Sequence, residues 1–284
     1  IRVLTSFLPV HSAASAIAGS RASVENWIPQ GIDPHDFQFS PADLRRLRNA
    51  HLLIVGGLGL EGWSEDKLRR ISGNDRLRLV EAAAGLPDSA LIRSDAEHEH
   101  DHDHDHDHAH GGPNPHFWLD PLLMAHAVTN VMEALCAADP EGAAAYRANA
   151  TAHVAALERL HADFVEGLRH CKTTAFITAH DAFPYLARRY QLRLVGVVES
   201  GAAGEPSAKA MAELSQVVRR EQARVLFTDG PPTRVARRMA SDLGLKLGRL
   251  ETLETGDLKP GAYEAGMRRN LAALRALLEV PASP

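Results

Sequence analysis

The sequence predicts an α/β fold of two lobes, each with a parallel sheet flanked by helices, and one long rigid helix that joins them. Three observations support this prediction. The chain has 284 residues, enough for two domains of ordinary size. Short apolar runs alternate with amphipathic stretches in both halves, a pattern typical of parallel sheets covered by helices. Residues 140–170, between these two parts, carry one continuous helical pattern.

The first lobe is expected to span residues 1–138. Its apolar runs predict strands at residues 2–8, 23–28, 51–55 and 76–82. The stretches between and after them predict helices at residues 11–18, 42–49, 61–71 and 121–137. The helix at residues 42–49 has a clear start signal, because Ser40 can cap its N-terminus and Pro41 suits its first turn.

The linking helix, residues 139–170, and the second lobe, residues 171–284, complete the prediction. One apolar stripe on the linking helix contains Leu157, Leu160, Phe164, Val165 and Leu168. Strands of the second lobe are expected at residues 173–178, 192–198, 224–228 and 246–250, and helices at 181–190, 206–219, 233–243 and 263–278. Ligands bind at the carboxyl ends of strands in such sheets, so a site is expected where the lobes face each other.

Composition argues against several classes of protein. The net charge is −5 and the isoelectric point is about 6.4, without any pronounced basic cluster, so nucleic acid is not expected as a partner. No apolar run is expected to reach the roughly 18–20 residues of a membrane span. The chain starts in a strand-like run with neither an initiating Met nor a signal peptide, so we interpret it as a mature or trimmed product.

Residues 97–110 alternate histidine with acidic residues. The histidines are His98, His100, His102, His104, His106, His108 and His110. An extended backbone would place their imidazoles on one side and the carboxylates on the other. Imidazole is a common zinc ligand, and a carboxylate can share the ion. With almost no apolar residues, residues 94–112 are predicted to form a mobile loop that binds several metal ions weakly.

Four other segments place a histidine or a carboxylate at a strand end or in a turn bounded by proline. They contain His35, His116, His180 and, in the fourth segment, Glu251 with Glu254. A single histidine beside an aromatic residue usually has a structural role. Three at strand ends, in a chain with a histidine-rich loop, indicate a metal site, because three imidazoles with a carboxylate or water make a tetrahedral zinc site.

Five segments together resemble a zinc-binding solute receptor of an ABC importer, a member of the metal-specific periplasmic binding proteins. They are Gly-Ile-Asp-Pro-His-Asp-Phe at 31–37, Gly-Leu-Gly-Leu-Glu-Gly-Trp at 57–63, His-Phe-Trp-Leu-Asp-Pro at 116–121, residues 180–190 with His-Asp-Ala-Phe and Tyr-Leu-Ala-Arg-Arg-Tyr, and Glu-Pro-Ser at 205–207. The resemblance covers essentially the whole chain. An acidic histidine-rich loop between the second and third segments is also typical of the zinc-binding members.

The resemblance implies that His35, His116 and His180 bind Zn²⁺ between the lobes. Manganese-type relatives have a carboxylate at the position of His180, and imidazole suits zinc better. The fourth ligand of the family is an Asp after the last strand of the second lobe. Here Glu251 aligns best with it, while Glu254 or water remain alternatives.

The resemblance also implies a periplasmic monomer that is no enzyme and that delivers zinc to an ABC transporter membrane permease. A periplasmic zinc metallochaperone is a candidate second partner, which would load the histidine-rich loop. Four carboxylates beside the ligands or at strand ends could orient a ligand imidazole or only cap helices: Asp36, Asp120, Asp181 and Glu199.

Three alternatives remain. A three-histidine zinc site with bound water could belong to a zinc-dependent hydrolase, although the sequence has neither H-E-x-x-H nor G-x-S-x-G. A zinc storage or buffering protein would use the histidine-rich loop as its main feature. Residues 57–62 match the dinucleotide-binding pattern G-x-G-x-x-G, but they follow about the third strand, whereas that pattern belongs to the first strand–helix turn.

Overall fold

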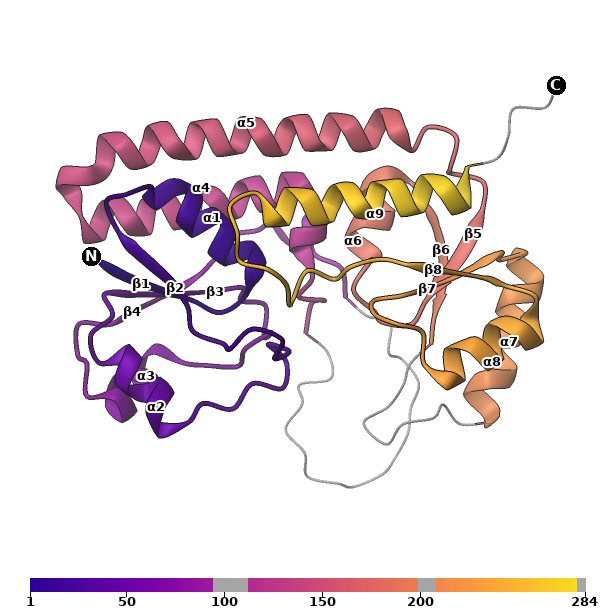
Figure 1. Cartoon of the computed structure of the whole chain (residues 1–284), viewed down its shortest axis with the longest axis horizontal. Helices are drawn as coiled ribbons and strands as arrows, with labels where there is room; N and C mark the ends of the chain where they lie inside the picture. Colours follow the sequence, from indigo (N-terminus) through magenta and orange to yellow (C-terminus); the bar gives the residue numbers. More distant parts are fainter. Residues whose placement is uncertain (94–111, 199–207, 280–284) are drawn as a thin grey trace.

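The computed structural model describes residues 1–93, 112–198 and 208–279, which form two lobes side by side (Figure 1). Each lobe contains one four-stranded parallel sheet. The strand order is β2-β1-β3-β4 in the first lobe and β6-β5-β7-β8 in the second, so the two topologies correspond strand for strand. The predicted fold class, two parallel sheets flanked by helices and joined by a long helix, is confirmed.

The first sheet consists of β1 (Arg2–Thr5), β2 (Ser23–Asn26), β3 (Leu52–Val55) and β4 (Arg78–Glu81). All four residues of β3, an interior strand, are buried. Parallel strands covered on both faces are apolar along their whole length, which explains the sequence Leu-Leu-Ile-Val. Strands β1, β2 and β4 end earlier than the predicted runs, whereas β3 ends at the predicted residue.

Helices cover both faces of this sheet: α1 (Leu8–Ala18), α2 (Pro41–Leu47), α3 (Glu65–Ser72) and α4 (Pro121–Ala138). Figure 1 shows α2 and α3 on one side of the sheet, with α1 and α4 on the other. Ser40 and Asp43 form a capping box at the start of α2, so the predicted start signal is confirmed. The third helix begins later than predicted, because Ser64 caps it and a glycine-rich loop precedes it.

The long helix α5 (Ala143–Gly167) runs along both lobes (Figure 1). Leu157, Leu160 and Phe164 are fully buried, as the apolar stripe predicted, and Leu168 just beyond the helix is 1% exposed. Val165 is the exception at 54% exposed. It follows Phe164 directly, and successive residues point about 100° apart around a helix, so Val165 leaves the buried face.

The second sheet consists of β5 (Ala175–Thr178), β6 (Arg193–Val197), β7 (Val225–Thr228) and β8 (Lys246–Arg249). Its helices are α6 (Pro184–Tyr190), α7 (Ala208–Glu221), α8 (Arg234–Leu243) and α9 (Ala262–Leu278). Helix α6 starts three residues later than predicted, with Pro184 at its first position, where proline is favoured. Residues 179–183 therefore remain a turn at the carboxyl end of β5.

After β8 the chain crosses back toward the first lobe in residues 250–261, the crossing segment, before α9 begins (Figure 1). Helix α9 then packs against α1 and α5. One apolar core joins the two lobes, since Val10 of α1, Phe164 of α5, Phe176 of β5 and Met267 of α9 belong to it. The predicted domain boundaries stay a prediction, and α9 contributes to the packing of the first lobe.

Helix α4 is long and apolar enough to cross a membrane by length and composition, contrary to the expectation from the sequence. It packs here between α5, α1 and the first sheet. Val128, Val131 and Leu135 on its inner face are fully buried. Its apolar composition is accounted for by its place in the core.

Candidate metal centre

Four side chains converge between the lobes: His35, His116, His180 and Glu254, here called the ligand cluster. Each offers one ligand atom, and the four atoms lie within 4.8 Å of one another. His35 lies in the loop after β2 and His116 in the turn before α4. His180 follows β5, and Glu254 lies in the crossing segment. Both lobes therefore contribute to the cluster.

The three imidazoles present the same ring nitrogen to the centre of the cluster. Oε1 of Glu254 lies 3.1 Å from Nε2 of His35 and 2.9 Å from Nε2 of His116. Nε2 of His180 lies 3.2 Å from Nε2 of His116. Lone pairs at such distances repel one another unless a proton or a metal ion lies among them. The donor set, three imidazoles and a carboxylate, suits a tetrahedral divalent cation such as zinc.

Burial divides the cluster into two pairs. The side chains of His116 and Glu254 are each 4% exposed, so they form its floor. The side chains of His180 and His35 are 26% and 35% exposed. An ion would therefore reach the cluster from the side of His35 and His180.

An Asp-Pro-His turn positions His35. Oδ1 of Asp33 accepts a hydrogen bond of 2.8 Å from the backbone N–H of His35, which closes the tight turn typical of aspartate. Phe37 anchors the next residues, with its ring 5.5 Å from Trp27 and 5.9 Å from Trp63, measured between centroids. Packing of Phe37 against these two tryptophans thus holds the polar turn in place.

A buried tryptophan positions His116 beside Glu254. Trp118, fully buried, donates through Nε1 to the carbonyl oxygen of Thr252 at 2.7 Å. The hydroxyl of Tyr263 donates to the carbonyl oxygen of Trp118 at 2.6 Å. These bonds fix the turn before α4 to the crossing segment and to α9.

The electrostatic environment of Glu254 favours its charged form. Burial raises the pKa of Glu254, but the neighbouring imidazoles of His116, His35 and His180 outweigh burial and hold this pKa well below its ordinary value. Glu254 therefore stays a carboxylate, the form that binds metal ions.

The three imidazoles respond differently to their surroundings. Burial lowers the pKa of His35 and of His180, but neighbouring carboxylates outweigh burial and raise both. Glu254 has this effect on His35, whereas Asp229 and Glu254 share it on His180. Burial prevails at His116 and lowers its pKa, so this imidazole is neutral at pH 7.

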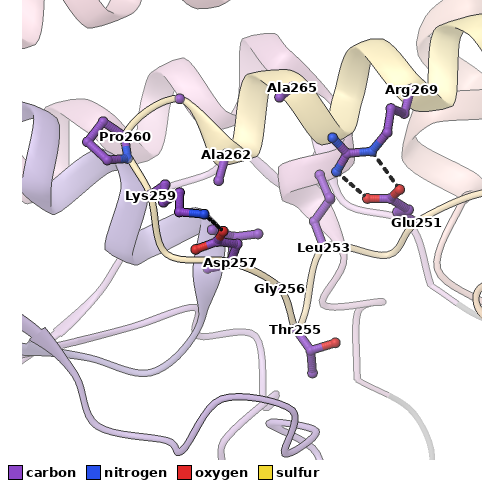
Figure 2. Close-up of a pocket in the computed structure, with 12 residues that line it drawn as sticks. Glu251, Leu253, Thr255, Gly256, Asp257, Lys259, Pro260, Ala262, Ala265 and Arg269 are labelled. Carbon is purple, nitrogen blue, oxygen red and sulfur yellow. Dashed lines mark hydrogen bonds and ion pairs between the residues drawn. The ribbon is translucent and has the colours of Figure 1, made fainter.

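Glu251, the residue that aligns best with the fourth ligand of the family, does not join the cluster. Its carboxylate accepts two hydrogen bonds of 2.7 Å from Arg269 of α9 (Figure 2). Leu253 has a φ of 63°, the left-handed conformation that residues other than glycine rarely adopt. The chain turns there, and Glu254 points to the cluster instead. Glu254, one of the alternatives left open, therefore lies in the ligand cluster, and Glu251 does not.

A pocket of about 270 Å³ lies beside the crossing segment, and no residue of the ligand cluster lines it. Figure 2 shows the residues that line this pocket. Its charged groups pair with one another, Glu251 with Arg269 and Asp257 with Lys259 at 2.7 Å. The pocket and the ligand cluster are therefore separate features.

The carboxylates expected near the ligands have mixed roles. Asp120 caps α4 and pairs with Arg189 at 2.7 Å, so it is structural. Asp181 accepts a hydrogen bond from the side chain of Asn114 at 3.2 Å. Asp36 is exposed. Glu199 lies outside the described residues, as do residues 205–207 and the seven histidines of the predicted loop.

Reasoning from the sequence missed Asn114 and Asp229. Oδ1 of Asn114 lies 2.8 Å from Nδ1 of His116, and Oδ2 of Asp229 lies 3.6 Å from Nδ1 of His180. A signal for Asn114 was available, because Asn-Pro-His at 114–116 repeats the Asp-Pro-His pattern of 33–35. Asp229 directly follows β7 and carried no comparable signal.

The glycine-rich loop at residues 56–62 has a structural explanation. The carboxylate of Glu61 accepts hydrogen bonds from the hydroxyl of Ser6 at 2.6 Å and from the N–H groups of Gly56 and Gly57 at 2.7 and 3.2 Å. Burial raises the pKa of Glu61, although these bonds oppose the effect. The loop amides that a dinucleotide phosphate would use are therefore already occupied.

Comparisons with known proteins agree with this geometry. Residues 3–277 match the family model ZnuA, described as zinc-uptake complex component A, periplasmic. The zinc-binding protein AdcA of Streptococcus pyogenes serotype M3 is 30% identical over 291 residues, covering 99% of this chain and 56% of AdcA. The chain thus spans about half the length of the curated relatives it matches.

Two solved structures resemble the fold over nearly the whole chain. The SBP FpvC of Pseudomonas aeruginosa with Ni²⁺ has a TM-score of 0.81 at 26% identity, and the match covers 100% of this chain and 99% of FpvC. Zn(II)-bound AdcA of Streptococcus pneumoniae has a TM-score of 0.78 at 26% identity, covering 99% of this chain and 59% of AdcA. The family match extends over nearly the whole chain and includes every residue of the ligand cluster. The chain belongs to the ZnuA family of periplasmic zinc-uptake complex components.

Proposed function

We propose that this chain is the zinc receptor of an ABC importer, which captures one Zn²⁺ ion between its lobes and delivers it to a membrane permease. One observation carries the proposal: the ligand atoms of His35, His116, His180 and Glu254 lie within 4.8 Å of one another and come from both lobes. A site shared by two lobes can couple binding to a small shift of one lobe against the other.

The chemistry of the donor set favours zinc as the cargo. Imidazole nitrogen suits zinc, nickel and copper, whereas manganese prefers oxygen ligands. Three nitrogens and one oxygen fill a tetrahedral zinc site. Purified protein is also expected to bind copper, because affinities of such sites follow the Irving–Williams order. Selection of zinc in the cell then depends on which metal is available.

The exposed pair of ligands suggests a route for capture and release. His35 and His180 face solvent, while His116 and Glu254 lie on the floor of the cluster. Helix α5 runs along both lobes and limits wide hinge opening, so release is expected to involve loops and small lobe shifts. The receptor would act as a monomer in the periplasm.

The histidine-rich stretch is proposed as an accessory collector. Its seven imidazoles would bind zinc weakly and pass it to the ligand cluster, or receive it from a periplasmic metallochaperone. If storage were the main function, most of the bound zinc would be held by this stretch. The chain would then bind several zinc ions weakly and none tightly.

A hydrolase is less well supported. A catalytic zinc keeps one open position for water, whereas this cluster offers four protein ligands. The chain also belongs to a family of zinc-uptake complex components, which favours a binding protein over an enzyme.

A competitive zinc titration of the metal-stripped chain tests the proposal, together with His180→Ala and the matched control His126→Ala. His126 is a histidine bonded to the carbonyl oxygen of Ala84, away from the cluster. We expect one tight equivalent and several weak ones, with the tight equivalent lost only in His180→Ala. Weak equivalents alone in the unmodified chain would exclude the receptor function and favour buffering.

A further inference from the structure

Asn114 makes contacts on both sides of its amide group, and it is only 5% exposed. Its Oδ1 lies 3.0 Å from the backbone nitrogen of His116 and 2.8 Å from Nδ1 of the same residue. Its Nδ2 lies 2.7 Å from the carbonyl oxygen of Asp181 and 3.2 Å from Oδ2 of that residue. One side chain thus connects the residue that carries one ligand imidazole to the residue after His180.

Two of these partners fix which way the amide points. A backbone N–H can only donate, so the atom that faces the nitrogen of His116 must be the oxygen of Asn114. A backbone carbonyl can only accept, so the atom that faces Asp181 must be the NH₂ group. Each contact alone determines the orientation, and the two agree.

The orientation of the amide then determines the tautomer of His116. Because Oδ1 of Asn114 accepts, Nδ1 of His116 must carry the hydrogen in the 2.8 Å contact. In a neutral imidazole the other nitrogen, Nε2, then keeps its lone pair. Nε2 is the atom that lies 2.9 Å from Glu254 and 3.2 Å from Nε2 of His180, at the centre of the cluster.

We infer that Asn114 is a positioning residue, which holds His116 in the Nδ1–H tautomer with its Nε2 lone pair directed at the metal. This inference rests on the proposed function, because the metal that His116 faces is the Zn²⁺ ion of that function. In the matching Asp-Pro-His turn, Asp33 accepts from the backbone N–H of His35. Asn114 makes the same contact to the backbone of His116 and, in addition, a contact to Nδ1 of its ring.

Further bonds hold Asn114 in place. The hydroxyl of Tyr185 donates to the carbonyl oxygen of Asn114 at 2.8 Å and accepts from the N–H of Ile92 at 3.2 Å. The N–H of Asn114 donates to the carbonyl oxygen of Ile92 at 2.7 Å. Backbone and side chain are both constrained, which a residue that orients a metal ligand requires.

The test compares Asn114→Ala, Asn114→Asp and the control Asn130→Ala. Asn130 also donates its amide hydrogens to two carbonyl oxygens, those of Ala82 and Ala84, but lies away from the cluster. The first readout is the ¹⁵N chemical shifts of the His116 ring in metal-free protein near pH 8, which report the tautomer. The second is zinc affinity by competition.

We expect the Nδ1–H tautomer in the unmodified chain and a mixture of tautomers in Asn114→Ala, with zinc affinity about 10- to 100-fold lower. Asn114→Asp keeps an acceptor for Nδ1, so it should retain the tautomer and recover part of the affinity. Asn130→Ala should match the unmodified chain in both readouts.

The outcomes separate this inference from the proposed function. An unmodified tautomer in Asn114→Ala overturns the inference, as does unchanged zinc affinity in a chain that binds zinc tightly. Failure of the unmodified chain to bind zinc overturns the proposed function, while the tautomer measurement still tests the contact between Asn114 and His116.

Discussion

Oε1 of Glu254 lies 2.9 Å from Nε2 of His116, although 138 positions separate the two residues in sequence. Both side chains are almost completely buried. The crossing segment brings them together, since it returns from the second sheet to the first lobe before α9 begins. Five predictions concern this arrangement, the contacts around it and the rest of the first lobe.

Glu254 rather than Glu251 is expected to bind the metal. Glu254→Gln should weaken zinc binding at least about tenfold, about 1.4 kcal/mol, because it removes a charged ligand from the cluster. Glu251→Gln should leave zinc affinity unchanged and lower the free energy of unfolding by less than about 1 kcal/mol, since its partner Arg269 is largely exposed. Competitive titration and urea denaturation measure the two quantities. A larger loss of affinity in Glu251→Gln would contradict the assignment.

Zinc affinity is expected to fall as the solution becomes acidic. The pKa values of His35 and His180 are raised by neighbouring carboxylates, so protons compete with zinc at a higher pH than at an ordinary histidine of pKa about 6.5. Competition titrations from about pH 6 to pH 8.5 should show the decline beginning above that value. Affinity that is constant over this range would exclude proton competition at these imidazoles.

The contribution of His35 and His180 to the stability of the metal-free protein should have the opposite dependence on pH. A histidine whose pKa is raised by folding adds free energy of unfolding below its unfolded pKa, and this contribution is lost as pH rises through the folded pKa. Urea denaturation of the metal-free chain measures it. The difference in free energy of unfolding between the unmodified chain and His180→Gln isolates the contribution of His180, and this contribution should decrease as the pH rises.

Removal of the histidine-rich stretch should leave the tight site intact. Replacement of residues 94–112 by a short Gly-Ser linker is expected to preserve one tight zinc equivalent and to abolish the weak ones. The flanks favour such a replacement, because Arg93 and Pro113 form an antiparallel bridge and therefore lie close together. Isothermal titration calorimetry counts both kinds of equivalent. If tight binding disappeared, these residues would belong to the primary site.

Glu61 is expected to stabilise the fold without affecting the metal. Glu61→Ala removes the acceptor for Ser6 and for the buried N–H groups of Gly56 and Gly57, so the free energy of unfolding should fall by about 3 kcal/mol. The control Glu133→Ala changes an exposed residue of α4 and should change the free energy of unfolding by less than about 0.5 kcal/mol. Urea denaturation of both variants tests this, and equal stability of the two would contradict it.

The sequence by itself determined the alternation of strands and helices, and with it the two parallel sheets. Apolar runs such as Leu52–Val55 can only be satisfied by burial on both faces, and local signals such as Ser40 with Pro41 mark helix starts. The three imidazoles His35, His116 and His180 were also recognisable, because each stands in a short motif with its own turn chemistry.

Only the tertiary structure decided between Glu251 and Glu254. The two residues have the same side chain and stand three positions apart, so neither composition nor spacing separates them. The left-handed turn at Leu253 and the pairing of Glu251 with Arg269 separate them. Likewise, the NH₂ group of Asn114 donates to the carbonyl oxygen of Asp181, 67 residues away. Side-chain direction in an irregular segment is set by distant partners, which local sequence does not encode.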